Sequence, residues 1–447
     1  MELLHERCAG LDVHKDTVVA CVRLSTPRTK ASAEVRTFST ITKGLLELGE
    51  WLTQQGVTHV AMESTGVYWK PVWHVLEGSF ELVLGNANHM RNLPGRKSDV
   101  KDAEWISDLL AHGLIRESFV PPTAIQALRD LTRTRTQCAR ELARHIQRIQ
   151  KTLEDANIKL ASFLSDVLGK SGRTMLEAII RGELEPARVA ALADYRVQAT
   201  SEELAEALRG QPTDHHRFLL RLHLDQIDHL DAAIHRLEDR IEDGLRPFRD
   251  VEARLKTVPG IRDRAVAVVV SELGVDVDRF PSPAHLVSWV GLCPQTHQSA
   301  GKIGSTRIRK GSPWLKALLV QCAWAAIRKP GYLRAQYHRI KNRRGPKKAI
   351  IAVAASMVTA IYYILRDAVT YSDLGADYFD KRDKAKLANR LRRRLAELGF
   401  EVELRETPPP PPAAEPAVSI GSSGGTVGAL AIELATTAGR WRWRLAM

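Results

Sequence analysis

Four acidic residues in the first quarter of the chain have types and positions that suit metal binding. Asp12 lies in "GLDVHKD" and Glu63 in "VAMESTGVYW", each after apolar residues typical of a strand and before a turn. Asp and Glu are uncommon in strands and costly to bury unpaired, so these positions favour a chemical role. Asp99 and Asp102 follow in "RKSDVKDAEW", three residues apart and therefore on one face of an expected helix.

Such a set of carboxylates favours phosphate chemistry. Oxygen-only ligands suit Mg²⁺ or Mn²⁺, which keep water molecules and take phosphate oxygens as further ligands. Two such ions about 4 Å apart can activate a nucleophile and stabilise the leaving oxygen of a phosphodiester. The cations around the aspartates would hold the nucleic-acid backbone; they are Arg96, Lys97 and Lys101. The alternative is four unrelated surface acids, two of them in the acidic first turn that helices favour.

The distribution of charge indicates a polyanionic partner. The chain of 447 residues has a formal charge of +13, which favours nucleic acid before a membrane surface. Between Arg279 and Arg366 it contains no Asp or Glu but sixteen Lys and Arg residues. A solvated surface normally mixes both signs, so this segment predicts contact with nucleic acid.

The order of expected elements predicts an α/β domain over residues 1–120. "CAGLDVHKDTVVACVRL" has two strand-like arms around a polar turn, and "VTHVAMEST" and "FELVLGNA" add short strands. The helical spacing of "TKGLLELGEWLTQQG" predicts a helix between the hairpin and these strands. Hairpin strands followed by a β–α–β unit indicate a mixed sheet.

Residues 121–250 are expected to be helical. A heptad repeat sustained for about three heptads predicts a coiled coil or long helical hairpin; its apolar residues are Leu220, Ile227, Leu230, Ile234, Leu237 and Ile241. Upstream, arginines spaced by four or seven share one helical face: Arg129, Arg133, Arg140, Arg144 and Arg148. These arginines form either an ordinary exposed face or a surface that follows a phosphate backbone, and the spacing favours neither.

Residues 251–371 are expected to form a third, mainly helical domain. "TVPGIRDRAVAVVVSELG" predicts a helix-hairpin-helix-like turn that presents backbone amides to a phosphate. A Gly/Ser-rich basic loop follows, "GLCPQTHQSAGKIGSTRIRKGSPWLK". The uncharged run at 349–365 is near the lower limit for spanning a bilayer. Its alanines and basic flanks favour a buried core helix instead.

The remaining features predict where the folded part of the chain ends and in which cellular compartment the protein lies. Residues 372–405 are expected to be a basic helical extension, and the Pro-, Gly- and Ser-rich residues 406–447 a disordered tail. Five scattered cysteines without a C-x-x-C pair argue against a zinc ribbon or disulfide framework and for a reducing compartment. "MELLHERCAG" lacks a cationic start followed by an apolar stretch, so no signal peptide is expected.

Several separated motifs carry a family resemblance: "GLDVHKDT", "AMESTGVYW", "GRKSDVKDAEWISDLL", "TVPGI", "GLCPQTHQSAGK" and "GADYFDKRD". Over roughly residues 6–405 the chain resembles the insertion-sequence-110 (IS110) family of bacterial transposases, the DEDD recombinases. The resemblance implies a RuvC-like N-terminal domain of the ribonuclease H fold, a C-terminal transposase domain, and a cytoplasmic, nucleoid-associated protein. It assigns the four metal-binding acids to Asp12, Glu63, Asp99 and Asp102, and the nucleophilic serine to Ser299.

A serine nucleophile implies a covalent route. Ser299 would attack a phosphate and form a phosphoserine link that conserves the bond energy for rejoining. The basic residues that would offset charge on the phosphorane are Lys302, Arg307, Arg309 and Lys310. Spacing alone does not single out Ser299, since a loop serine in a Gly-rich turn is ordinary and Ser305 is a rival. His297 lies two residues before Ser299, but a lone loop histidine is usually not a proton carrier.

The resemblance also implies partners. These are donor and target DNA, a bridge RNA that pairs with both, and further copies of the chain in a dimer or tetramer, with no membrane. The arginine stripe and the cluster "KNRRGPKK" would serve such an RNA, the latter through Arg343, Arg344, Lys347 and Lys348. The residues themselves do not distinguish RNA from DNA.

Three functions compete for this sequence. The first is a recombinase that cleaves and rejoins DNA with four acids and a serine. The second is a metal-dependent, structure-specific nuclease like a junction resolvase, which hydrolyses without rejoining and needs only the acids. The third is a non-enzymatic nucleic-acid scaffold, which explains the charge but not acids at strand ends. Ser299 separates the first two, and the acids separate both from the third.

Overall fold

The computed structural model of the protein describes residues 3–26, 29–64, 66–90, 102–294, 297–299, 302–305 and 307–403. Arg96, Lys97, Asp99 and Lys101, together with the expected tail at 406–447, lie outside the described residues. The chain divides into two compact units, Met1–Pro122 and Thr123–Met447, and each unit has its own hydrophobic cores.

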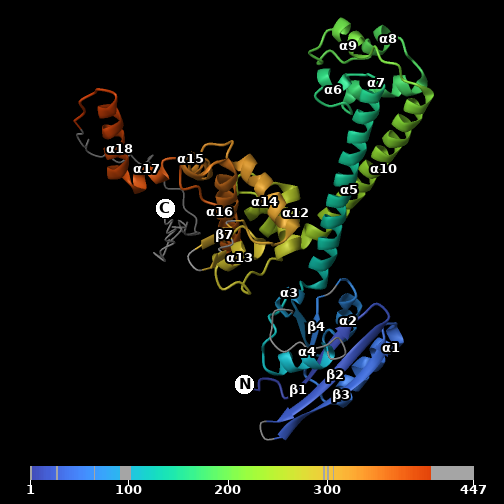
Figure 1. Ribbon diagram of the computed structural model, residues 1–447, viewed down its shortest axis with the longest axis vertical. Helices are drawn as coiled ribbons and strands as arrows, with labels where there is room; N and C mark the ends of the chain where they lie inside the picture. Colours follow the sequence, from blue (N-terminus) through green and yellow to red (C-terminus); the bar gives the residue numbers. More distant parts are fainter. Residues whose placement is uncertain are drawn as a thin grey trace, which may run out of the picture. The chain divides into compact units, whose positions relative to one another are not determined.

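The first unit is built on a five-stranded mixed sheet in the order β3-β2-β1-β4-β5 (Figure 1). The first three strands pair antiparallel, whereas β1, β4 and β5 run parallel. The strands are β1 (Arg7–Val13), β2 (Thr17–Thr26), β3 (Thr29–Ser39), β4 (His59–Glu63) and β5 (Glu81–Gly85). The prediction of a mixed sheet that starts with a hairpin is confirmed.

Helices cover both faces of this sheet. Alternate side chains of a strand point to opposite faces, so Leu11 of β1 and Met62 of β4 belong to one core with α1 and α2. Cys8 and Ala61 belong to the opposite core, which α4 completes. The helices are α1 (Thr42–Gln54), α2 (Trp69–Leu76), α3 (Ala87–Met90) and α4 (Asp102–Ala111).

The second unit contains two long helices, α5 (Thr123–Asp155) and α10 (Asp214–Leu245), which lie side by side (Figure 1). The heptad residues Leu220, Ile227, Ile234 and Ile241 of α10 are buried, as the seam of a helix pair requires. The remainder of the chain was expected to be mostly helical, and this prediction is confirmed.

Each end of the helix pair joins a hydrophobic core. At one end, Leu220 and Leu224 of α10 pack with short helices, namely α6 (Leu160–Phe163), α7 (Lys170–Arg181), α8 (Pro186–Ala190) and α9 (Ser201–Ala207). At the other end, Ile241 and Leu245 join the core of the C-terminal helices. The helices that follow α10 are η2 (Arg246–Phe248), α11 (Arg249–Leu255), α12 (Asp263–Leu273), α13 (Pro283–Val290), α14 (Pro313–Ala326), α15 (Tyr332–Arg344), α16 (Pro346–Arg366), α17 (Tyr378–Arg382) and α18 (Lys384–Glu397).

The apolar run at 349–365 forms α16. Val353, Met357 and Ile361 are fully buried in the C-terminal core, and the Tyr362 hydroxyl donates a hydrogen bond to the Phe280 carbonyl at 3.0 Å. Across the described ranges, α16 alone is long and apolar enough to cross a membrane, and half of its most apolar stretch is buried inside the protein. Its place in the core agrees with the prediction of a buried helix.

The Gly/Ser-rich segment before α14 contains a two-stranded hairpin, β6 (His297–Ser299) and β7 (Lys302–Ser305). Only the backbone of these strands is described. The expectation of a loop is therefore wrong for these residues. With only two residues between the strands, antiparallel pairing is local, and it forms even where the polar, glycine-containing sequence carries little strand signal.

Candidate active site

Asp12 and Glu63 lie next to each other on one face of the sheet. β1 and β4 pair in parallel with Leu11 opposite Met62, so the next step of the register brings Asp12 beside Glu63, the last residue of β4. Leu11 and Met62 both face the α1–α2 core. The residues that follow them therefore face the α4 side.

Asp102 begins α4 on that same side. Gly10 precedes Asp12 by two residues and lies against the backbone of α4, where an added Cβ would come within 2.4 Å of the Ala103 carbonyl and the Ser107 amide. This close approach places the first turn of α4 over β1. Asp12, Glu63 and Asp102 are all half-buried. Asp12 and Glu63 thus lie at the carboxyl ends of β1 and β4 and face the side of the sheet that α4, which begins at Asp102, covers.

His14 lies beside this group. Its Nε2 atom is 2.9 Å from the Asp12 Oδ2 atom, and its side chain is 61% exposed whereas that of Asp12 is 25% exposed. The imidazole therefore orients the Asp12 carboxylate from the solvent side. The motif "GLDVHKD" contains His14, but the sequence reasoning assigned it only to a turn.

The carboxylates have the chemistry that the predicted divalent ion requires. Carboxylate oxygens on one face, partly sheltered from water, are the ligands that Mg²⁺ and Mn²⁺ prefer. Among the residues that the structure describes, no three His, Cys, Asp or Glu side chains lie close enough together to hold a metal ion. Asp99, the fourth acid, lies outside those residues. The described chain supplies a common face and suitable chemistry rather than a closed coordination shell.

The hairpin separates the two rival serines. Ser299 ends β6 opposite Lys302, at the turn, whereas Ser305 lies opposite His297 at the other end of the pairing. Ser299 therefore lies at the turn end of the strand pairing and Ser305 at its open end. Lys302 is its cross-strand neighbour.

The base of the hairpin is tied to α13. The Arg309 amide donates to the Cys293 carbonyl at 3.1 Å, and the Arg309 Nη1 atom donates to the Ser288 hydroxyl at 3.3 Å. Gly311 passes so close to α13 that an added Cβ would lie 2.3 Å from the Val290 carbonyl. The other predicted cations here, Arg307 and Lys310, are exposed.

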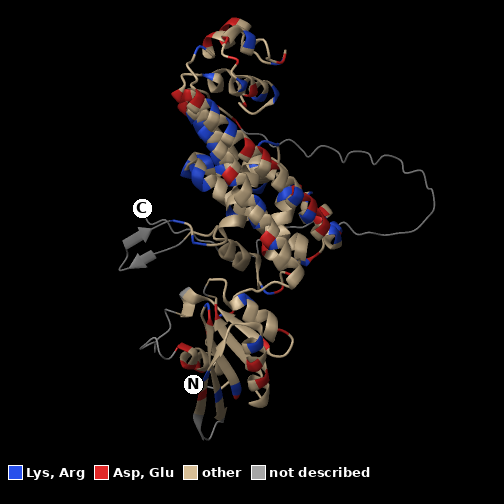
Figure 2. Ribbon diagram, turned by 90° about the vertical axis from the view of Figure 1, so that its right-hand side faces the viewer, with Lys and Arg blue, Asp and Glu red and all other residues tan. Residues whose placement is uncertain are grey.

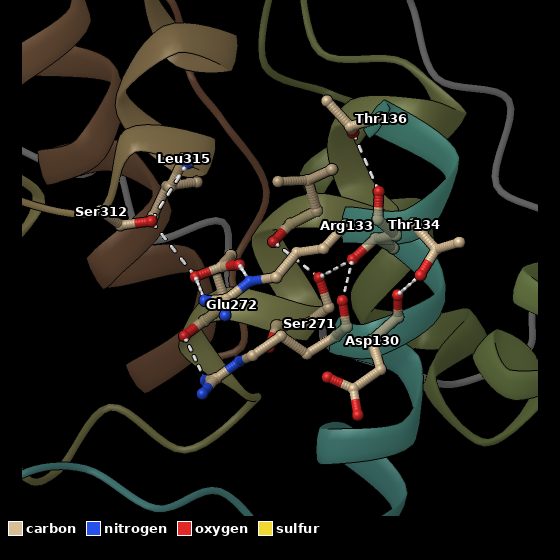
Figure 3. A network of polar contacts seen from close by, with 11 residues as sticks. Asp130, Arg133, Thr134, Thr136, Ser271, Glu272, Ser312 and Leu315 are labelled. Carbon is tan, nitrogen blue, oxygen red and sulfur yellow. Dashed lines mark hydrogen bonds and ion pairs between the residues drawn. The ribbon is translucent and has the colours of Figure 1, made fainter. Parts of the chain in front are cut away.

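Two residues of the arginine stripe, Arg129 and Arg133, are engaged within the fold, and Figure 3 shows the second of them. Arg129 donates to the carbonyls of Ser271 and Glu272, at 2.9 Å each, which satisfies carbonyls of the last turn of α12. Arg133 donates to both carboxylate oxygens of Glu272, at 2.7 and 3.0 Å. Both guanidinium groups therefore stabilise the contact between α5 and α12, an internal role that spacing did not predict.

Arg140, Arg144 and Arg148 are exposed. Contact with phosphates stays a prediction for these three arginines of the stripe. Figure 2 shows acidic residues among the basic ones along the helices of the second unit. The stripe is thus a local cationic face within a helix pair of mixed charge.

The "KNRRGPKK" cluster lies at the junction of two helices. Arg343 and Arg344 end α15, Gly345 has a φ of +81°, and Lys347 and Lys348 begin α16. All four cations are exposed. Cations stabilise the C-terminal end of a helix but not its N-terminal end. Stabilisation of a helix end therefore accounts for the arginines but not for the two lysines, whose contact with nucleic acid stays a prediction.

Sequence reasoning missed Gly10, whose signal was a glycine inside an apolar strand, a position that often marks close approach of another backbone. It also missed Glu272, because its ion-pair partner Arg133 lies 139 residues away along the chain.

Comparisons with known proteins bear on both units. The family model of DEDD transposases named for IS110, described as "Transposase", matches residues 9–158. A second model, described as "Transposase IS116/IS110/IS902 family", matches residues 252–338. The first includes Asp12, Glu63, Asp99 and Asp102, and the second includes Ser299. The chain belongs to the IS110 family of transposases.

Curated relatives agree with this membership. An "Insertion element IS110 uncharacterized 43.6 kDa protein" from Streptomyces coelicolor is 31% identical over 119 residues, 26% of this chain and 29% of that protein. "Putative transposase y4qE" from Sinorhizobium fredii is 23% identical over 278 residues, 60% of this chain and 58% of that protein. "Putative transposase y4pF/y4sB" from the same organism is 25% identical over 208 residues, 44% of this chain and 52% of that protein. The matches thus span between about a third and three fifths of these relatives.

Proposed function

We propose that this IS110-family chain is a DNA transposase that cleaves and rejoins DNA with its acidic residues, a divalent metal ion and Ser299. The observation that carries the proposal is the position of Asp12, Glu63 and Asp102 on one face of the sheet. Unrelated surface acids would not be expected both at the carboxyl ends of two neighbouring strands and at the start of the helix that covers the same face.

The first unit is proposed to be a RuvC-like domain of the ribonuclease H fold. Support comes from the strand order β3-β2-β1-β4-β5, with three antiparallel strands followed by two parallel ones. This topology places the ends of β1 and β4 in the middle of the sheet, where two acids are held rigidly side by side. A rigid carboxylate pair is what a metal-dependent phosphodiester reaction requires.

Asp12, Glu63, Asp99 and Asp102 would hold Mg²⁺ or Mn²⁺. When bound, the ion supplies Lewis-acid stabilisation of charge on the phosphate oxygens. The chain's own residues do the rest: the carboxylates fix the site on the α4 face, and His14 orients Asp12 through the 2.9 Å contact. Arg96, Lys97 and Lys101 precede or flank the aspartates in sequence and are proposed to bind the DNA backbone.

Ser299 is proposed as the nucleophile. Its Oγ atom forms a new bond to the phosphorus, the bond from phosphorus to the departing strand's oxygen breaks, and that oxygen takes up the proton that the serine loses. One phosphodiester is exchanged for another, so the reverse attack by a strand hydroxyl rejoins DNA without an added energy source. The position of Ser299 at the tip of the β6–β7 hairpin, opposite Lys302, supports this role. Lys302, Arg307, Arg309 and Lys310 would stabilise the developing charge.

Donor and target DNA are the proposed substrates, and a bridge RNA is the proposed guide. The exposed Arg140, Arg144 and Arg148 and the cluster at the α15–α16 junction are the surfaces available for them. A dimer or tetramer would bring the hairpin of one copy to the acids of another. The proposed division is a catalytic domain at 1–120, a coiled coil at 121–250, a serine-bearing domain at 251–371 and a basic extension at 372–405.

The test is a search for a covalent adduct. The protein is incubated with Mg²⁺, its associated RNA and a labelled DNA site, denatured, and resolved by electrophoresis. The proposal predicts a protein–DNA adduct that Ser299→Ala and Asp102→Ala each abolish, and that the rival variant Ser305→Ala retains.

Other outcomes give different answers. Cleavage without an adduct, lost in Asp102→Ala but unaffected by Ser299→Ala, would make the protein a metal-dependent nuclease. An adduct that persists in Ser299→Ala but disappears in Ser305→Ala would move the nucleophile to the base of the hairpin.

A further inference from the structure

A cavity of about 250 Å³ lies in the second unit between α5, α12 and α14. Small side chains leave this space open, among them Ala139 and Ala143 of α5 and Ala317 of α14. Polar groups line the same cavity, namely the guanidinium groups of Arg133, Arg140 and Arg264 and the indole of Trp314. The proposed acids and the hairpin take no part in it.

The cavity carries more positive charge than the fold uses. Glu272 is 2% exposed and is held by Arg133 and by the Ser312 hydroxyl, which donates to its Oε2 atom at 3.2 Å (Figure 3). The charge of Arg133 is thereby neutralised. Arg140 and Arg264 form no ion pair or hydrogen bond within the described ranges of the chain. Partial burial and the nearby charge of Arg135 lower the pKa of Arg264, and the charge of Glu238 offsets this only in part, so a further anion beside Arg264 would be favourable.

Trp314 gives the cavity an aromatic wall. The Arg140 Cζ atom lies 4.9 Å from the centre of the Trp314 ring and the Arg133 Cζ atom 5.7 Å from it. A planar guanidinium and an indole are the two side-chain surfaces on which single-stranded bases stack. Apolar walls, an aromatic plane and spare cations together match a group that is flat and apolar at one end and anionic at the other.

We propose that this cavity binds one unstacked nucleotide of a single-stranded nucleic acid. The base lies against Trp314 and the alanines, and the phosphate contacts Arg140 and Arg264. A duplex does not fill the site, because its bases remain inside the stack. RNA and DNA strands offer the same chemistry, so the strand type is an outcome of the test.

The experiment measures binding without cleavage, so its result does not depend on whether Ser299 forms an adduct. Fluorescence anisotropy in the presence of EDTA measures the affinity of the full chain for three labelled ligands of equal length: oligouridylate, oligodeoxythymidylate and a duplex. Trp314→Leu is expected to weaken single-strand binding about tenfold, as the loss of one base stack does, and to leave duplex binding unchanged. Tighter binding of one oligonucleotide identifies the strand type, and either preference supports the site if the Trp314 effect accompanies it.

Trp324→Leu is the matched control, since Trp324 lies on the same helix and is 43% exposed but does not line the cavity. Arg140→Gln removes an exposed cation without opening the core, so it tests the site even if Trp314→Leu fails to fold. It is expected to weaken single-strand binding several-fold at low salt. Unchanged single-strand affinity in Arg140→Gln, or an equal loss of duplex binding, overturns the proposal.

Discussion

The acids and Ser299 are held in place by different physical means. Asp12 and Glu63 lie on a sheet whose central strand β1 is paired on both sides, and α4, which begins at Asp102, packs so tightly over it that Gly10 has no room for a side chain. Ser299 lies on a hairpin of two short strands. The acid face is therefore fixed by close backbone packing, whereas the hairpin depends on what holds its base.

The base of the hairpin is linked to the rest of the second unit through polar contacts. Ser312, just after the hairpin, donates to Glu272 of α12, and Glu272 is held in turn by Arg133 of α5 (Figure 3). A buried carboxylate thus connects the hairpin's exit to the long helix pair. The comparison predicts that polar substitutions disturb the second unit most, and steric ones the first.

The largest effect is expected from Arg133→Met. This change leaves the Glu272 carboxylate buried without its bidentate partner, and breaking one side of a buried ion pair typically costs about 3–5 kcal/mol. Urea unfolding monitored by circular dichroism measures the loss of stability.

Arg135→Met is the control on the same helix. Arg135 pairs with Glu238, whose side chain is 46% exposed, so its loss should cost about 1 kcal/mol or less. Equal losses in the two variants would mean that the Glu272 contacts do not hold the second unit together.

The next effect is steric and belongs to the first unit. Gly10→Ala places a Cβ within 2.4 Å of two backbone atoms of α4, so the helix must move away from β1 and carry Asp102 with it. Overpacking of this kind costs about 2 kcal/mol, and the proposed cleavage activity should fall with it. Thermal unfolding and DNA cleavage are measured together.

Gly49→Ala in α1 is the matched change in the same unit. An added Cβ there meets only the Leu76 side chain, at an ordinary 3.6 Å, and alanine favours a helix over glycine by about 1 kcal/mol. This variant should be as stable as the parent or more so. If Gly10→Ala is equally harmless, close packing does not position α4.

The same two regions show what the sequence alone could predict. Asp12 and Glu63 stood out because acids are rare in apolar strands, and the order of a hairpin followed by a β–α–β unit correctly predicted a mixed sheet. That both face α4 depends on the register of β1 with β4, which no local pattern contains. Arg129 and Arg133 had the spacing of an exposed face, yet their partners lie 139 to 143 residues away. Local patterns predict elements, whereas long-range pairing decides which charges remain available.

A smaller effect is expected at the start of α14. The Ser312 hydroxyl accepts a hydrogen bond from the Leu315 amide as the helix cap and donates to Glu272. Ser312→Ala should therefore cost about 1 kcal/mol and loosen the hairpin's exit. Ser282→Ala, at the start of α13, removes a serine that makes no such capping bond and should cost less in the same unfolding assay. A larger loss of stability in Ser282→Ala than in Ser312→Ala would show that the contact with Glu272 contributes nothing.

The smallest effect is expected from chemical labelling of two cysteines in the parent protein, one in each of the two regions. Cys8 of β1 is fully buried, and burial raises its pKa to about 12. Cys293 at the hairpin base is half-buried, and burial raises its pKa although the charge of Arg309 offsets part of the rise. The folded protein keeps the Cys8 proton between about pH 9 and 12, where an unfolded chain loses it. The contribution of the Cys8 thiol to the free energy of unfolding is therefore fully present below about pH 9 and is lost as the pH rises toward 12.

At pH 8.5, iodoacetamide should accordingly modify Cys293 well before Cys8, because alkylation requires both a thiolate and access. Peptide mass spectrometry over a time course gives the two rates, and Gly10→Ala should raise the Cys8 rate selectively by loosening α4, whose Ser107 carbonyl accepts the Cys8 thiol bond at 3.5 Å. Comparable rates in the parent protein would show that the sheet beneath the acids opens as freely as the hairpin base. The acid face would then need a bound partner, and not its packing alone, to be held in place.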